Sequence, residues 1–242
     1  MKKFFILCAM LATGLAATAQ NLQLHYDFGR HFYSDDEDGR QAVTATFEHF
    51  RADKLGSWYY FIDLDVDKKG VAGAYTEVSR EFNFYKPCDK GAFAAHIEYD
   101  GGLSRGAGSF QQAGLIGAAW NGHNADFSKT YSLQVMYKHF IDDKNPGRDA
   151  YASFQVTGVW GLNFCQNKLT FSGFFDVWSE KQWWDGKRHL VFLSEPQLWY
   201  NFNKNFSAGT EFEFSNNFVY SSKTGQNDKF YVNPTLALKY TF

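Results

Sequence analysis

Carboxylates recur at every second position in several stretches of the chain. The stretch "FIDLDVD" places Asp63, Asp65 and Asp67 two residues apart, and "TEFEF" spaces Glu211 and Glu213 in the same way. In an extended strand, side chains two residues apart share one face and lie about 7 Å apart along it. That spacing is too long for one metal ion to bind all three aspartates, so the run indicates a row of carboxylates that attracts cations.

Aromatic side chains share the face of these acids. Tyr59 and Phe61 precede Asp63 in steps of two residues, and Trp178 follows Asp176 in the same way. A ring can stack on a flat solute while neighbouring carboxylates accept hydrogen bonds from it. The pattern therefore indicates binding of small polar solutes. The alternative is that inward aromatic rings only fill a narrow interior.

Motifs typical of catalysis are absent from the sequence. There is no G-x-S-x-G motif, and His49 is the only strand histidine that the alternation turns away from the acids. The segment 34–39, "SDDEDG", resembles a calcium loop, but Ser34 and Ala45 hold its first and closing ligand positions, so we interpret it as a solvated loop. We predict no enzyme activity, no catalytic residue, no metal ligand and no cofactor.

The elements that must position these groups are strands. Apolar and polar residues alternate with a period of two, which is typical of strands with one apolar face and differs from the spacing in amphipathic helices. Most segments have the roughly 9–11 residues that a tilted strand needs to cross a bilayer. Twelve segments show the pattern: 22–29, 42–50, 57–66, 74–85, 92–100, 110–121, 129–140, 150–164, 169–178, 189–202, 206–216 and 229–242.

The connections between these segments alternate in length. Tight connections at 51–56, 86–91, 165–168 and 203–205 alternate with longer charged ones at 30–40, 67–73, 101–109, 141–148, 179–188 and 219–228. Short periplasmic turns and longer external loops are typical of outer-membrane barrels. Because the bilayer core cannot satisfy unpaired backbone groups, such a sheet must close on itself. The sequence predicts an all-β protein, a closed antiparallel 12-stranded transmembrane β-barrel.

The predicted interior is acidic. Lys138, Lys239, His25 and His96 are the basic residues assigned to it. Such an interior attracts cations and repels anions, which makes phosphorylated solutes poor candidates unless loop arginines compensate. The acids assigned to it are Asp27, Glu48, Asp63, Asp65, Glu77, Glu81, Glu98, Asp176, Glu195, Glu211 and Glu213, and the aromatic residues are Tyr59, Phe61, Phe174, Trp178, Trp199 and Tyr231.

One residue disagrees with this assignment. Arg80 falls on the apolar face of its strand, which requires a bulge or a position near the membrane interface. The alternative of a soluble sandwich or lipocalin-like barrel would place the charged residues outside and the apolar ones inside.

The two ends of the chain indicate export and membrane insertion. Lys2 and Lys3, the apolar run 4–15 and the small residues 17–19 predict a signal peptide at 1–19, followed by the barrel at 20–242. Without residues 1–19 the net charge falls from −2 to −4, which argues against nucleic-acid binding. The last strand ends on Phe242 and resembles the sorting signal read by the outer-membrane barrel assembly machinery. We expect the outer membrane of a Gram-negative bacterium, with its lipids as partners.

Two cysteines follow the predicted signal peptide. Cys88 and Cys165 both lie in turn-like segments on the predicted periplasmic side. They form a disulfide if the two turns lie close together in an oxidising compartment, and stay isolated thiols otherwise.

Part of the chain resembles a known family. The stretch "TATFEHFRADKLGSWYYFIDLDV", the later "AYTEVSREFNF" and the final "KYTF" resemble the nucleoside-specific channel-forming protein Tsx and its outer-membrane relatives, most clearly over 42–100. The resemblance is greater still to an uncharacterised branch of that superfamily, for which no substrate is implied. It implies a twelve-stranded barrel with a narrow aromatic-lined pore and passive nucleoside uptake, with Tyr59, Phe61, Asp63 and Glu77 at the matching positions.

The sequence thus predicts an outer-membrane channel for passive uptake of small polar solutes, with nucleosides as the leading candidates. The alternatives are a lipase-like barrel enzyme and a structural or adhesive barrel that transports nothing. The predicted solute-binding residues are Tyr59, Phe61, Asp63, Glu77, Glu81, Glu98, Glu195, Glu211 and Glu213.

Overall fold

The computed structural model describes residues 17–105, 108–142 and 148–242, without the side chains of residues 17–19, 108 and 109. Most of the predicted signal peptide, residues 1–16, lies outside the described residues. No helix in the described part of the chain is long and apolar enough to cross a membrane.

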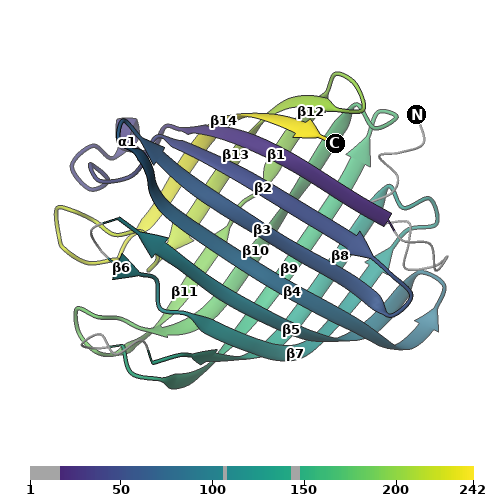
Figure 1. The fold of residues 1–242 in the computed structure, drawn as a ribbon, viewed down its shortest axis with the longest axis horizontal. Coiled ribbons are helices and arrows are strands. Elements are labelled where there is room, and N and C mark those ends of the chain that lie inside the picture. The colour runs from purple at the N-terminus through teal and green to yellow at the C-terminus, as the bar shows by residue number, and fades with distance from the viewer. Residues whose placement is uncertain (1–16, 106–107, 143–147) are drawn as a thin grey trace.

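Antiparallel strands form one continuous sheet that closes into a barrel (Figure 1). The first and last strands close the barrel, because β1 pairs with β14 from Asn21 opposite Thr241 to Asp27 opposite Thr235. A short helix, α1 (Gly29–Phe32), follows β1. The strands are β1 (Ala17–Asp27), β2 (Val43–Ala52), β3 (Gly56–Asp67), β4 (Gly70–Cys88), β5 (Gly91–Ser104), β6 (Gly108–Ser109), β7 (Ala113–His123), β8 (Lys129–Phe140), β9 (Tyr151–Phe164), β10 (Leu169–Lys181), β11 (Arg188–Ser194), β12 (Gln197–Asn201), β13 (Phe206–Asn216) and β14 (Phe230–Thr241).

The wall consists of twelve strands, as the sequence predicts. β11 and β12 are two halves of one wall strand, because both pair with β10 on one side and with β13 on the other. The break falls at Glu195 and Pro196, where proline cannot donate a backbone hydrogen bond. The small strand β6 pairs only with β5 and lies outside the wall.

The two faces of the wall have opposite character. On β1, Leu24 is 51% exposed and Gln23 is 1% exposed, and Leu24 lies opposite the equally exposed Leu238 of β14. The outer face therefore carries mostly aliphatic and aromatic side chains, whereas the inner face holds most of the polar and charged ones. This is the reverse of a soluble barrel, so the lipocalin-like alternative is wrong.

Connection lengths alternate as predicted, with one exception. β3 and β4 are joined by residues 68–69 alone. The segment 67–73 was predicted to be a longer loop, but β3 continues to Asp67 and β4 begins at Gly70. The longest described connection is 28–42, which contains α1.

Arg80 lies on the outer face opposite Trp58. Its Nη2 donates a 2.9 Å hydrogen bond to Asp53 Oδ1 in the β2–β3 turn. Its guanidinium carbon lies 5.1 Å from the ring centroid of Trp58 and 4.8 Å from that of Phe82, which leaves the residue 4% exposed. The register shifts of β4 lie away from it, near Ala72 in the pairing with β3 and from Asn83 onward in the pairing with β5. A position beside the turn therefore accommodates the charge, and no bulge is needed.

The possible disulfide is not formed. Cys88 and Cys165 are both free and exposed. They lie in the β4–β5 and β9–β10 turns, and β7 and β8 separate β5 from β9 in the sheet. At about 4.8 Å per strand step the two turns are at least about 14 Å apart along the wall, well beyond the Cα separation of a disulfide.

Replacing Arg80 tests this anchoring. We expect Arg80→Ala to lower the free energy of unfolding by about 1–2 kcal/mol, because two cation–π contacts are lost. The Arg80 hydrogen bond lowers the pKa of Asp53 below its ordinary 3.8, so the ion pair stabilises the fold above that pH and its contribution is lost as the pH falls through the lowered pKa.

The measurement is urea unfolding of the barrel in vesicles, followed by tryptophan fluorescence. Arg51→Ala is the matched control, because Arg51 is exposed on the same face opposite Trp58. An equal effect of the two substitutions would contradict the anchoring role.

Candidate functional site

The inner face receives every residue that the sequence assigned to solute binding. The pairing register places Tyr59, Phe61 and Asp63 of β3 on the face opposite to Trp58. Glu77 of β4 lies opposite Phe61 and therefore shares this inner face. Seven of the nine predicted residues are half-buried and two are buried: half-buried are Tyr59, Phe61, Asp63, Glu77, Glu98, Glu195 and Glu211, and buried are Glu81 and Glu213.

The two buried acids have hydrogen-bond or ion-pair partners within the protein. Glu81 accepts a hydrogen bond from Asn121 Nδ2 at 2.7 Å and contacts His96 Nδ1 at 3.3 Å. Glu213 contacts Arg40 Nη2 at 2.7 Å. These two carboxylates are therefore part of the wall's own polar network and are less available to a solute than the half-buried acids.

One acidic group combines strands from opposite ends of the chain. Glu195 lies within electrostatic range of Glu211 and Asp63, and Glu211 also of Glu48. Polar neighbours hold two of these acids, because Gln197 Nε2 donates to Glu211 Oε2 at 2.6 Å and Thr46 Oγ1 donates to Asp63 Oδ1 at 2.5 Å. We call Glu48, Asp63, Glu195 and Glu211 the β2–β13 acidic group.

Basic and aromatic residues adjoin this group. The Nζ of Lys239 lies 3.8 Å from the ring centroid of Trp199, and His25 Nδ1 lies 3.5 Å from Glu211 Oε1. Trp199 Nε1 donates to Gln197 Oε1 at 2.9 Å. The cation–π contact and these polar contacts fix the orientation of the Trp199 ring against the wall.

A second acidic group lies on β4 and β5. It consists of Glu77, Glu98 and Asp100, and we call it the β4–β5 acidic group. Glu77 lies directly opposite Asp100 across the two strands. Lys138 of β8 donates to Asp100 Oδ2 at 2.9 Å. The sequence analysis missed Asp100, because it is the last residue of the segment 92–100, where the strand was expected to end.

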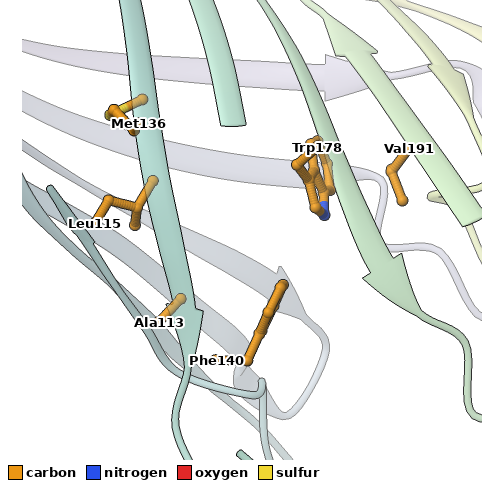
Figure 2. Close-up of a cluster of buried hydrophobic side chains, with 6 residues drawn as sticks. All are labelled: Ala113, Leu115, Met136, Phe140, Trp178 and Val191. Carbon is orange, nitrogen blue, oxygen red and sulfur yellow. The ribbon is translucent and has the colours of Figure 1, made fainter. Parts of the chain in front are cut away.

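An apolar cluster lines the inner face next to the β4–β5 acidic group, because Leu115 and Ala113 of β7 lie opposite Glu98 and Asp100 of β5. Figure 2 shows its six side chains, which come from β7, β8, β10 and β11. Lys138 Nζ lies 5.3 Å from the ring centroids of both Phe140 and Trp178, so the cluster borders the charged groups. Its members are Ala113, Leu115, Met136, Phe140, Trp178 and Val191, of which the sequence predicted only Trp178.

Arg40, in the loop after α1, reaches the inner wall. Its Nη2 lies 2.8 Å from Asp27 Oδ2 and 2.7 Å from Glu213 Oε2. Burial lowers the pKa of Arg40, but the charges of Glu213 and Asp27 outweigh burial and raise that pKa above its ordinary value. Arg40 therefore stays charged and neutralises part of the interior. No local pattern distinguishes Arg40 from Arg30, so sequence analysis could not single it out.

The same loop is fixed to the wall by its acids. Glu37 Oε1 accepts a 3.0 Å hydrogen bond from Asn233 Nδ2, and burial raises the pKa of Glu37. Asp36 Oδ1 accepts from Lys229 Nζ at 2.6 Å, a bond that lowers the pKa of Asp36. Gly29 permits the close packing, because a Cβ there would lie 2.5 Å from Glu37 Oε2. The loop thus covers part of one barrel mouth.

Comparisons with known proteins place the chain in a family. The model of a family described as Domain of unknown function (DUF5020) matches residues 19–242. The chain belongs to the DUF5020 family. No curated protein matches this DUF5020 sequence.

Solved structures share the fold of this DUF5020 barrel. The NanC porin is 11% identical with a TM-score of 0.58, and the alignment covers 93% of this chain and 99% of NanC. The KdgM porin is also 11% identical, with a TM-score of 0.51 and the same coverage. At this identity the likeness shows the β-barrel fold alone, and both the outer-membrane location and the nucleoside specificity of the Tsx resemblance stay predictions.

Replacing Arg40 tests its role in the interior. We expect Arg40→Gln to lower the free energy of unfolding by about 2 kcal/mol, because Asp27 and Glu213 lose a charged hydrogen-bond donor in a site with little water. Urea unfolding in vesicles measures the change. Arg30→Gln, an exposed arginine of α1, is the control and should unfold like the wild type. Indistinguishable curves for the two variants would show that Arg40 contributes nothing.

Proposed function

We propose that this DUF5020 protein is a passive channel in the outer membrane of a Gram-negative bacterium, for small polar solutes that are neutral or positively charged. One observation carries the proposal: half-buried carboxylates and aromatic rings on the inner face are enclosed by an apolar outer face. An apolar belt suits contact with lipid hydrocarbon. Acidic inner walls concentrate cations and repel anions. The proposal includes insertion by the barrel assembly machinery through the last strand and Phe242.

Nucleosides are the leading solute within this class. Tyr59, Phe61 and Tyr75 form a row on the inner face, with ring centroids 6.1 Å and 6.0 Å apart. A planar base can stack on such a row, while Asp63 and Glu77 accept hydrogen bonds from sugar hydroxyls. Nucleotides suit the interior less well, because their phosphates meet like charges.

Ion selectivity tests the channel itself. In planar bilayers with a KCl gradient, we expect cation-selective conductance from the wild type. Glu195→Gln together with Glu211→Gln should lower the cation-to-anion permeability ratio by about fourfold per charge. A unit charge about 10 Å away in water acts with about 0.4 kcal/mol on each ion, which favours the cation and disfavours the anion about twofold each. Asp126→Asn, an exposed carboxylate in the β7–β8 turn, should leave the ratio unchanged.

Two outcomes would favour the other functions. Absence of conductance from correctly folded protein would indicate a structural or adhesive barrel. Robust phospholipid hydrolysis by the purified wild type would indicate an enzyme.

Liposome uptake tests the solute. We expect radiolabelled uridine to enter vesicles that contain the wild type faster than uridine monophosphate does, because the acidic wall repels phosphate. Phe61→Ala should slow uridine entry without reducing KCl conductance, because it removes stacking and no charge. Phe93→Ala, an exposed phenylalanine on the outer face, is the control. Equal entry of the two solutes would contradict nucleoside preference.

A further inference from the structure

The β4–β5 acidic group brings three carboxylates together. One oxygen from each of Glu77, Glu98 and Asp100 lies within 4.8 Å of the oxygens of the other two. All three residues point to the inner face, since Glu77 pairs with Asp100, and Glu98 precedes Asp100 by two positions on β5. The arrangement is therefore built into neighbouring strands of the rigid wall.

Each of these carboxylates is held in place by a contact to one of its oxygens. Tyr75 Oη donates to Glu77 Oε1 at 2.9 Å, and His96 Nε2 lies 3.1 Å from Glu98 Oε2. Lys138 Nζ donates to Asp100 Oδ2 at 2.9 Å. These contacts orient the three carboxylates toward one another.

The other oxygen of Asp100 has no such contact. Asp100 is 4% exposed, and its Oδ1 is buried without a hydrogen-bond partner among the described residues. Leaving a buried polar atom unpaired costs about 1–3 kcal/mol, and more for a charged group. This atom is an independent sign that the group accommodates a positive ligand.

The local charge also favours a cation. Asp176 of β10 lies within electrostatic range of Glu77 and Asp100, and Lys138 supplies one positive charge beside them. When ionised, the four carboxylates carry more negative charge than Lys138 and the adjacent His96 can offset. A divalent cation would reduce this repulsion.

We propose that the β4–β5 acidic group binds a divalent cation, Ca²⁺, through Glu77, Glu98 and Asp100. Ca²⁺ prefers oxygen ligands at about 2.3–2.6 Å, so ligands on opposite sides of it lie about 4.6–5.2 Å apart. Mg²⁺ requires a tighter shell, with opposite ligands about 4.0–4.2 Å apart. Both nitrogens of the nearby His96 face carboxylates, Glu81 and Glu98, so a metal that seeks nitrogen finds no available ligand there.

Direct binding tests this inference. The full chain, folded in detergent, is titrated with Tb³⁺, a Ca²⁺ analogue whose luminescence the nearby Tyr75 can sensitise. We expect saturable binding of one ion per chain, displaced by Ca²⁺ at concentrations at least tenfold lower than by Mg²⁺. Isothermal titration with Ca²⁺ alone should give the same stoichiometry.

Two variants locate the site. Glu77→Gln and Glu98→Gln should each weaken Ca²⁺ binding at least tenfold, and both keep an oxygen that Tyr75 or His96 can contact. Glu211→Gln, in the β2–β13 acidic group, should bind Ca²⁺ like the wild type. Heat-dependent mobility in gel electrophoresis confirms that each variant is folded.

The proposal is overturned if the wild type shows no saturable Ca²⁺ binding, or if Glu211→Gln weakens binding as much as Glu98→Gln, which would indicate diffuse attraction by the whole interior. Binding is measured without conductance. A chain that conducts but binds no Ca²⁺ overturns only this inference, and a chain that binds Ca²⁺ but does not conduct overturns only the proposed channel.

Discussion

Backbone hydrogen bonding between the first and last strands is the constraint on which the rest of the structure depends. β1 pairs with β14 on one side and β2 on the other, so the sheet has no free edge at the point where the chain begins and ends. Closure fixes which face of every strand points inward, since a slip of one residue would exchange the two faces. The acidic interior follows from this register.

The acidic residues of the interior differ in how their negative charges are compensated. Glu81 and Glu213 lie among donors, whereas Glu195 and Glu211 adjoin other carboxylates and stay half-buried. Solvent or a positively charged solute must compensate the charges of Glu195 and Glu211, because an unpaired buried charge is costly. The same difference separates carboxylates that hold the wall together from carboxylates that stay partly exposed inside the barrel.

Charged residues of the loop after β1 form ion pairs with residues of the barrel wall and with Lys229, just before β14. Arg40 contacts Asp27 and Glu213, and Asp36 contacts Lys229 near the start of β14. The loop therefore covers part of one mouth, and the positive charge of Arg40 is directed at the wall.

The sequence by itself determined the strand count, the two faces and the inward direction of Glu77, Glu98 and Glu211, because the period of two is a local property that survives into the barrel. It also identified Arg80 as the exception on the outer face. Tertiary structure alone decided that Arg80 pairs with Asp53, that Cys88 and Cys165 lie apart, and that Arg40 enters the interior. It also brought Asp100 beside Lys138. These outcomes depend on the curvature of the wall and on which strands become neighbours, and alternation within one strand carries no information about either.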